Sequence, residues 1–312
     1  MPSPVVKNQK EKRSSFISGH SFSRNIQLYA LLFLPLMFFL IFKYAPMYGI
    51  LIAFKDYNIF QGVFKSPWAG VSVFKEIFKI SDFITALRNT FMLNLLDLLV
   101  SFPAPIILAI LLNEIISKWY KRISQTILYL PHFLSWVIIG GMSFQIFATS
   151  GGVINNFIRS MGHEAIPFLT DKHYWLAVYL IVGVWHSAGW GTIIYLAALT
   201  SINSELYEAA HVDGANRFRR IWHITLPGIR PTVVILLILA LGKIPEIGFE
   251  RPFIIGNILV KDYADVLSTF VYRVGLQSAQ YSIATAVGLF QSVVGLVFLM
   301  ISNFIAKALG ED

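Results

Sequence analysis

The sequence predicts an all-α integral membrane protein with six transmembrane helices, and three observations support this fold class. Hydrophobic residues make up 56% of the 312 residues and charged residues only 13%, with a mean hydropathy of +0.64, unlike a soluble domain. Six apolar stretches are each long enough to cross a bilayer, which takes about 20 helical residues. Because these stretches are continuous rather than alternating, each is expected to satisfy its backbone hydrogen bonds as a helix. The predicted spans are residues 26–45, 89–113, 124–147, 175–200, 229–247 and 280–305.

The distribution of lysine and arginine near the span ends predicts the orientation. Five basic residues against one acid, Glu11, precede the first span, and three against Glu114 follow the second. By the positive-inside rule, residues 1–25 form a cytoplasmic N-terminal segment, 26–305 the membrane domain and 306–312 a cytoplasmic tail. The first apolar run is longer than a signal-peptide core and no cleavage site follows it, so we expect it to remain. The basic residues are Lys7, Lys10, Lys12, Arg13 and Arg24 in the leader and Lys118, Lys121 and Arg122 in the loop.

The segment between the first two spans contains apolar residues at approximately helical spacing. This pattern is typical of a short amphipathic helix lying at the outer membrane interface. The residues are Phe74, Ile77, Phe78, Ile84 and Leu87.

The most polar stretch of the second half is "ELYEAAHVDGANRFRRIWHITLPGIRP", residues 205–231. Four crossings from a cytoplasmic N-terminus place it in the cytoplasm. Ser204 is expected to cap a short helix whose first turn carries Glu205, where a helix favours negative charge. Gly214 supplies the backbone conformation that ends this helix, and a second short helix follows until Pro227 stops it. From the residues alone the loop is either a solvated connector or, with its exposed alanines, a docking element.

The spacing within this loop resembles the signature of permease subunits in binding-protein-dependent ABC importers. EAA is followed after two residues by DGA, then by I-x-L-P and a further proline. The stretches "FKYAPMYGILIAFKDYN" and "DVLSTFVYRVGLQSAQYSIATAVGLFQSVVGL" resemble the carbohydrate-type branch, and within it the LplB- and YteP-like polysaccharide or oligosaccharide permeases. The residues that match the loop signature are Glu208, Ala209, Ala210, Asp213, Gly214, Ala215, Ile224, Leu226, Pro227 and Pro231.

This resemblance implies a type I ABC importer permease in the bacterial plasma (inner) membrane, forming half of the route for an oligosaccharide. It implies four kinds of partner: a second homologous permease, two cytoplasmic ATPases that bind ATP and Mg, an external solute-binding protein and membrane lipid. An acidic, polysaccharide-derived cargo is the narrower form of the expectation. In the family the loop, here residues 203–228, docks as a coupling helix on the ATPase. The implied coupling residues are Glu208, Ala209, Ala210, Asp213, Gly214, Leu226 and Pro227.

The sequence contains no recognisable motif for nucleotide binding, catalysis or metal binding. The dipeptide Gly242-Lys243 is followed by Ile244 and lacks the upstream glycine of a phosphate-binding P-loop. There is no GxSxG or HExxH motif, no paired His or acidic residues with metal spacing, and no cysteine. We therefore expect no catalytic residue, metal or cofactor in this chain and no nucleic-acid partner.

Polar residues within the second and sixth spans are candidates for the translocation pathway. A charge at the bilayer centre costs about 2.5–3.5 kcal/mol on insertion scales and usually faces a pathway or a partner. Asn94, Asp97 and Ser101 share one face of the second span, but an interhelical hydrogen bond would also explain them. In the sixth span Gln291 belongs to a small, polar face with Gly288 that is typical of close helix packing, although its side chain could reach a pore.

Three tryptophans are candidates for stacking on sugar rings because they fall near the middle of the third and fourth spans. They are Trp136, Trp185 and Trp190, and packing alone would also account for them. Trp175 is instead expected in an interfacial belt. The glycines of "WHSAGWG" would allow a bend or the close approach of another helix, and its His186 is expected to be a core histidine.

Two other classes of function compete with the permease. An ion- or proton-coupled secondary transporter would use Asp97 as its coupling acid, but it leaves the motif loop unexplained. An intramembrane enzyme lacks paired catalytic groups.

Overall fold

The computed structural model describes residues 26–308, so the N-terminal segment 1–25 and the last residues of the tail, 309–312, lie outside the described part. The chain divides into two units, Met1–Gly49 and Ile50–Asp312. In the first, α2 (Ile26–Phe39) continues as a π-helical segment (Leu40–Tyr44), and the 3-10 segment Ala45–Phe54 crosses into the second.

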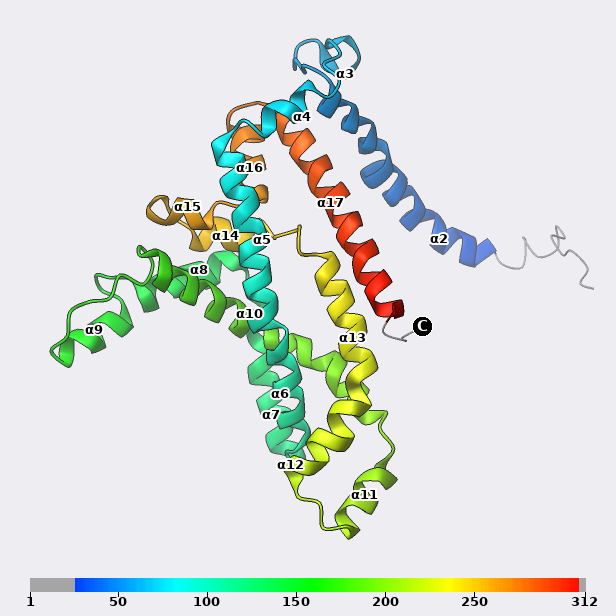
Figure 1. Ribbon diagram of the computed structural model, residues 1–312, viewed down its shortest axis with the longest axis vertical. Helices are drawn as coiled ribbons and strands as arrows, with labels where there is room; N and C mark the ends of the chain where they lie inside the picture. Colours follow the sequence, from blue (N-terminus) through cyan, green and yellow to red (C-terminus); the bar gives the residue numbers. More distant parts are fainter. Residues whose placement is uncertain (1–25, 309–312) are drawn as a thin grey trace, which may run out of the picture. The chain divides into compact units, whose positions relative to one another are not determined.

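The second unit is helical almost throughout the described residues, with one isolated bridge between Lys55 and Trp68 (Figure 1). Its α-helices are α3 (Gly62–Lys65), α4 (Ser72–Ile77), α5 (Ser81–Ser101), α6 (Pro103–Asn113), α7 (Lys118–Tyr129), α8 (Trp136–Phe147), α9 (Val153–Ser160), α10 (Lys172–Thr200), α11 (Ser204–Val212), α12 (Arg217–Arg220), α13 (Leu226–Gly242), α14 (Glu250–Ile255), α15 (Lys261–Ala264), α16 (Leu267–Val271) and α17 (Tyr281–Ala308). The shorter 3-10 or π-helical segments are η3 (Leu130–Phe133), η4 (Ile221–Thr225), η5 (Ile258–Val260) and η6 (Tyr272–Gln277).

Six predicted crossings correspond to five continuous helical spans and one bent pair. The continuous spans are Leu28–Phe54, Ser81–Asn113, Lys172–Thr200, Arg217–Gly242 and Tyr281–Phe304. The prediction of a single third helix over 124–147 was wrong: Lys118–Phe133 and Trp136–Phe147 meet at a bend of 103°. Pro131 provides no amide hydrogen there, and the Ser135 hydroxyl accepts from the Ile138 amide at 3.4 Å to begin α8 afresh.

The boundaries of the fifth span also differ from the prediction. Helix runs through Arg217–Gly242, so it starts earlier than residue 229, and the chain from Lys243 to Phe249 is not helical. Pro227 does not stop the helix as predicted, because the π-helical turn η4 immediately before it widens the hydrogen-bond ladder. Gly242, Pro245 and Gly248 explain the break that follows.

Helix α10 is the central helix of this unit and packs against α5, α6, α7 and α13. Two glycines of "WHSAGWG" allow this, as expected from the sequence. A Cβ at Gly189 would collide with the backbone of Leu128 in α7, and one at Gly191 would lie 2.8 Å from the Cγ of Pro105 in α6. By contrast, nothing lies within 4 Å of a Cβ at Gly288, so this glycine does not serve a close helix contact within the described chain.

The short helix predicted between the first two spans exists as α4, and part of its apolar face is buried inside the protein. Val73 and Ile77 are buried in a core with Phe83 and Phe270, and α4 packs on α17. Ile84 belongs to α5 and not to this helix. This helix is therefore held by burial against neighbouring helices, and its position at the outer membrane interface stays a prediction.

Trp175 is likewise a core residue and not part of an interfacial belt. Its side chain is fully buried, and its Nε1 donates a hydrogen bond to the carbonyl of Ile255 at 3.0 Å. The partner lies in α14, between the fifth and sixth spans, so α14 is anchored to the start of α10.

Polar contacts fix the rest of the segment between the last two spans to α5. Asn89 donates to the carbonyls of Asp262 and Asp265, each at 2.9 Å. Arg273 forms ion pairs with Asp265 at 2.7 Å and with Asp82 at 3.0 Å. The start of α5 thus supports residues that follow it by about 180 positions.

Candidate functional site

The polar loop predicted to couple transport to ATP hydrolysis begins with α11. The N-cap is Asn203 and not Ser204 as predicted: the Asn203 Oδ1 accepts from the Glu205 amide at 3.0 Å, and its Nδ2 donates to the Glu205 carboxylate at 3.1 Å. Glu205 occupies the first turn, as expected.

Gly214 forms the elbow between the two loop helices, as predicted from its position. Its φ of +71° lies in the left-handed region that glycine adopts without strain. The Gly214 amide donates to His211, and the next amide, of Ala215, donates to Ala210 at 2.9 Å. Asn216 then caps α12 by accepting from the Arg219 amide at 2.9 Å.

The surface of this loop is unusually apolar for a solvated connector. Glu208, Ala209 and Asp213 are exposed, Ala210 is half-buried, and α11 and α12 contain no buried residue. Exposed apolar side chains surround the motif, with Val212 87% and Phe218 68% exposed. Such a patch indicates a contact with another protein. The exposed apolar residues are Leu206, Val212, Phe218 and Trp222.

One hydrogen bond joins the loop to the membrane helix that follows it. The Tyr207 hydroxyl of α11 lies 3.0 Å from the hydroxyl of Thr225, which is buried in η4. Leu226 is half-buried and Pro227 exposed where α13 begins. Helix α11 is therefore linked by a side-chain contact to the base of the fifth span.

The break in the fifth span is the second feature that can serve transport. Its free carbonyls are bound by two of the residues predicted to line the pathway. Asn94 donates to the Ile244 carbonyl at 2.6 Å, and Gln291 donates to the Pro245 carbonyl at 2.7 Å. Non-helical backbone at membrane depth needs such partners, because lipid offers none.

Asp97 is ion-paired with Arg251, a residue that the sequence analysis did not single out. The Arg251 guanidinium lies 3.1 Å from the Asp97 carboxylate and donates to the Tyr179 carbonyl at 2.6 Å. It also lies over the Tyr179 ring, 3.8 Å from the centroid. A Cβ at Gly183 would collide with this guanidinium, so the glycine makes room for it. The signal available in the sequence was an arginine four residues after the predicted end of the fifth span, close to Gly242, Pro245 and Gly248.

A cavity of about 440 Å³ lies between this ion pair and the break. It brings together three of the predicted pathway residues, namely Asn94, Asp97 and Trp136. The Trp136 ring lies 5.7 Å from the Arg251 guanidinium and so forms an aromatic wall beside a charged one. The remaining lining residues are Tyr179, Ile247, Gly248, Phe249, Glu250, Arg251 and Pro252.

The other predicted pathway residues do not line this cavity. Gln291 is used in the hydrogen bond to Pro245. Trp185 faces a separate apolar cavity, and Trp190 stacks on His132 with ring centroids 4.5 Å apart. His186 lies among these rings, 4.5 Å from Trp136.

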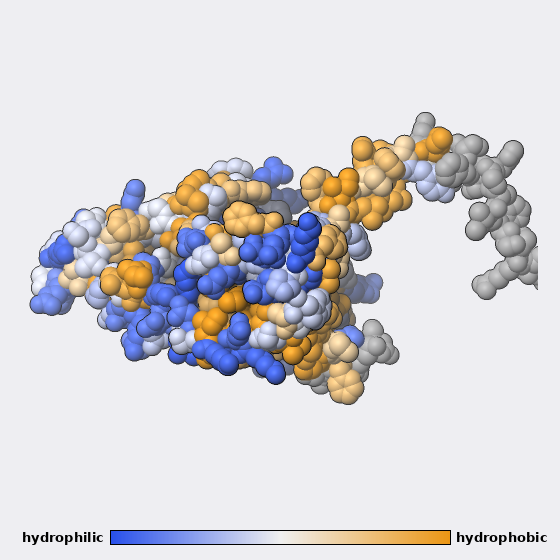
Figure 2. Space-filling model, turned by 90° about the horizontal axis from the view of Figure 1, so that it is seen from above, coloured by the Kyte–Doolittle hydropathy of each residue, from blue (hydrophilic) through white to orange (hydrophobic). Residues whose placement is uncertain are grey.

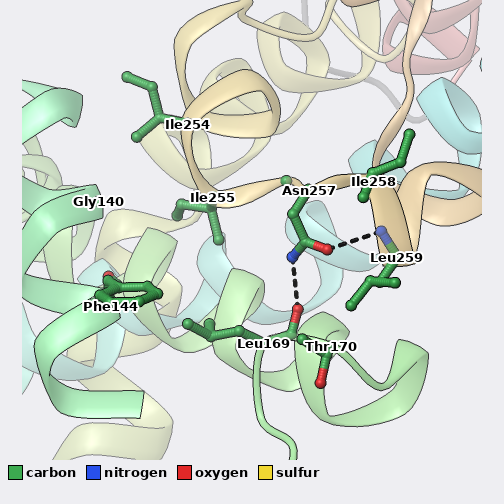
Figure 3. Close-up of a pocket in the computed structure, with 11 residues that line it drawn as sticks. Gly140, Phe144, Leu169, Thr170, Ile254, Ile255, Asn257, Ile258 and Leu259 are labelled. Atoms are coloured by element: carbon green, nitrogen blue, oxygen red, sulfur yellow. Dashed lines mark hydrogen bonds between the residues drawn. The ribbon is translucent and has the colours of Figure 1, made fainter. Parts of the chain in front are cut away.

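A further cavity of about 340 Å³ lies between α8 and the residues after α14, and Figure 3 shows its lining. Asn257 closes one side by donating to the Leu169 carbonyl at 2.7 Å and accepting from the Leu259 amide at 3.0 Å. Most of the other labelled side chains are apolar, including Phe144, so this cavity offers a sugar few hydrogen-bonding groups. Within residues 26–308, no cluster of three His, Asp or Glu residues could hold a metal ion.

The spans, the exposed motif loop and the broken fifth span together define the membrane subunit of a transporter. The family model "Binding-protein-dependent transport system inner membrane component" matches residues 101–311, and the chain belongs to this family of multi-pass inner-membrane proteins. Protein LplB of Bacillus subtilis (strain 168) is 49% identical over 93% of this chain and 91% of its own. The polygalacturonan/rhamnogalacturonan transport system permease protein YteP of the same organism is 43% identical. This match covers 97% of the present chain and 94% of YteP.

The fold is also that of a solved permease chain. A chain of the bacterial alginate ABC transporter, crystallised in complex with an alginate pentasaccharide-bound periplasmic protein, is similar with a TM-score of 0.84 and 42% identity. The match covers 93% of this chain and 97% of that chain. The type I permease architecture expected from the loop is therefore confirmed.

The Asp97–Arg251 pair gives a direct stability prediction. Asp97→Asn leaves the guanidinium, whose side chain is only 13% exposed, without its counter-charge. This change is expected to destabilise the protein by about 3 kcal/mol, whereas Asp97→Asn combined with Arg251→Gln should recover part of the loss because no charge remains unpaired. Thermal unfolding of the purified proteins in detergent measures both effects. Equal melting temperatures for the wild type and Asp97→Asn would show that the pair does not stabilise the protein.

Proposed function

We propose that this chain is one of two permease subunits of an ABC importer that carries an oligosaccharide into the cell. The observation that carries the proposal is the exposed two-helix loop, with its glycine elbow at Gly214 and its apolar surface. Cytoplasmic ATPase subunits bind ATP and Mg, and this chain contributes no catalytic residue or cofactor of its own.

The loop has the chemistry of a docking element. Ala209 leaves a flat surface that a partner can approach closely, while Val212 and Phe218 offer apolar area to bury. Glu208 adds one exposed charge, which orients the contact with a basic partner. In this proposal residues 203–228 lie in the cytoplasm and fit a groove on the ATPase.

The outer partner in the proposal is a solute-binding protein that delivers the cargo. The alginate transporter named above was crystallised with such a periplasmic protein, and a second homologous permease completes the pathway. Viewed from above, much of the coloured surface mixes hydrophilic and apolar residues (Figure 2). A mixed surface of this kind suits a wet protein contact better than lipid tails.

Two observations support an oligosaccharide as the cargo. The similar YteP and alginate proteins are named for polysaccharide transport, and the cavity at the break combines an aromatic ring, Trp136, with hydrogen-bonding groups such as Asn94. Aromatic faces cover the C–H surface of sugar rings and polar groups bind their hydroxyls. Proton coupling through Asp97 has no support, because its carboxylate is neutralised by Arg251 at 3.1 Å.

The loop proposal predicts that Glu208→Lys and Gly214→Pro leave the chain in the membrane but abolish uptake. The first reverses the docking charge, and the second imposes a negative φ where +71° is needed and removes the amide that bonds His211. Co-purification of the ATPase with tagged permease should fall at least tenfold. Glu164→Lys, the same reversal at an exposed external residue, is the control. Full ATPase recovery with both loop variants would make the loop a passive connector.

The transport proposal predicts ATP-dependent uptake by proteoliposomes that contain both permeases, the ATPases and the binding protein. Labelled oligogalacturonides, alginate oligosaccharides and neutral galacto-oligosaccharides are the test solutes. Uptake of at least one should require ATP and be insensitive to ionophores, and Trp136→Ala should lower it without lowering basal ATP hydrolysis. Uptake that needs an ion gradient and no ATP would contradict the proposal.

A further inference from the structure

The break in the fifth span carries charged side chains that the bilayer does not tolerate. Within nine residues the sequence has Lys243, Glu246, Glu250 and Arg251. The first three are exposed, and no ion-pair partner for them exists among residues 26–308. Arg251, by contrast, is neutralised by Asp97.

The depth of these charges follows from the residues that hold the break. Gln291 lies ten residues after the start of its span and thirteen before its end, and Asn94 lies thirteen after the start and nineteen before the end of its own. Because both bind carbonyls of the break, residues 244–245 lie beside interior residues of these two long apolar helices and not beside their ends. Exposed charges at this depth must face water or another protein, because contact with lipid tails is too costly.

The cavity beside the break favours water. Its lining includes Asn94, Asp97 and Glu250, and the backbone there is not part of a helix. Broken spans are tolerated at membrane depth where they line a water-filled cavity, and transporters often bind solutes at such places.

The charge balance of the cavity indicates what kind of solute it accepts. Asp97 and Arg251 cancel, so the exposed carboxylate of Glu250 leaves one negative charge in excess. A carboxylate accepts hydrogen bonds from hydroxyl groups but repels another carboxylate. Trp136 supplies the apolar wall for a ring.

We propose that the segment 243–251 and the cavity beside it line the water-filled route of this subunit, and that Glu250 makes this part of the route favour uncharged, hydroxyl-rich sugar units over acidic ones. The inference rests on the proposed permease function and narrows its substrate class. It differs from the acidic cargo expected from sequence resemblance.

Single cysteines test the inference because the chain has no cysteine of its own. Gly248→Cys fits without strain, since Gly248 lines the cavity, has no positive φ and has nothing within 4 Å of a Cβ. Leu95→Cys is the apolar comparison, next to Asn94 in α5 and 50% exposed. The complete complex in proteoliposomes is treated with a trimethylammonium or a sulfonate methanethiosulfonate reagent. Each rate on this chain is divided by the rate on a small free thiol.

The expected result has two parts. Gly248→Cys reacts on the order of 100-fold faster than Leu95→Cys, and the cationic reagent is favoured there over the anionic one by about tenfold. Adding Glu250→Gln reduces that preference to less than about threefold. Glu246→Gln, an equally exposed carboxylate that does not line the cavity, leaves the preference in place.

Equal, slow reaction at Gly248 and Leu95 overturns the aqueous route and indicates that the partner permease covers the break. Fast reaction with no preference between the reagents, or a preference unaffected by Glu250→Gln, overturns the charge selection. ATP-dependent uptake by the same wild-type vesicles is measured in parallel. If uptake is normal when these results fail, the inference is wrong and the permease function stands; absence of uptake counts against the function itself.

Discussion

The rest of this structure depends on one constraint: non-helical backbone between apolar spans must find hydrogen-bond partners within the protein. The fifth span ends at Gly242, and the carbonyls that follow need donors that lipid does not supply. Asn94 and Gln291 provide them, one from the second span and one from the sixth. Three spans are therefore held together at one depth by two side-chain amides, and the polar residues that suggested a pathway first serve to stabilise the break.

The contacts at the two ends of the fifth span are organised around this break. The Asp97–Arg251 ion pair lies on the side that follows the break. Arg251 lies in the first turn of α14, and its guanidinium fits over the Tyr179 ring because Gly183 has no side chain there. Beyond it, Trp175 and Asn89 anchor α14 and the residues after it. At the other end the same span, Arg217–Gly242, begins in the motif loop, so one helical span connects this loop to the break. In the proposed function, movement of the loop changes the position of the break and hence the access to the cavity.

Local sequence patterns predicted most of the fold, whereas contacts between residues far apart in the sequence could not be predicted from such patterns. Apolar length gave the spans, and the fixed spacing around Gly214 identified the loop and the family. Arg251 was missed because its partner lies 154 residues away. Trp175 was placed in an interfacial belt because its burial depends on α14. The N-cap was predicted at Ser204 but is Asn203. Both residue types cap helices, and only the backbone conformation decides between them.

The central claim is that residues 247–249 form an unwound, water-facing segment between stable helices. Hydrogen–deuterium exchange of the assembled importer, read by mass spectrometry, tests this most directly. The account predicts that the amides of 247–249 exchange about 100-fold faster than those of α13 residues 233–239 and α17 residues 288–294. Protection of 247–249 equal to that of the two flanking helices would contradict it, because the fifth span would then be continuous or its break covered by protein.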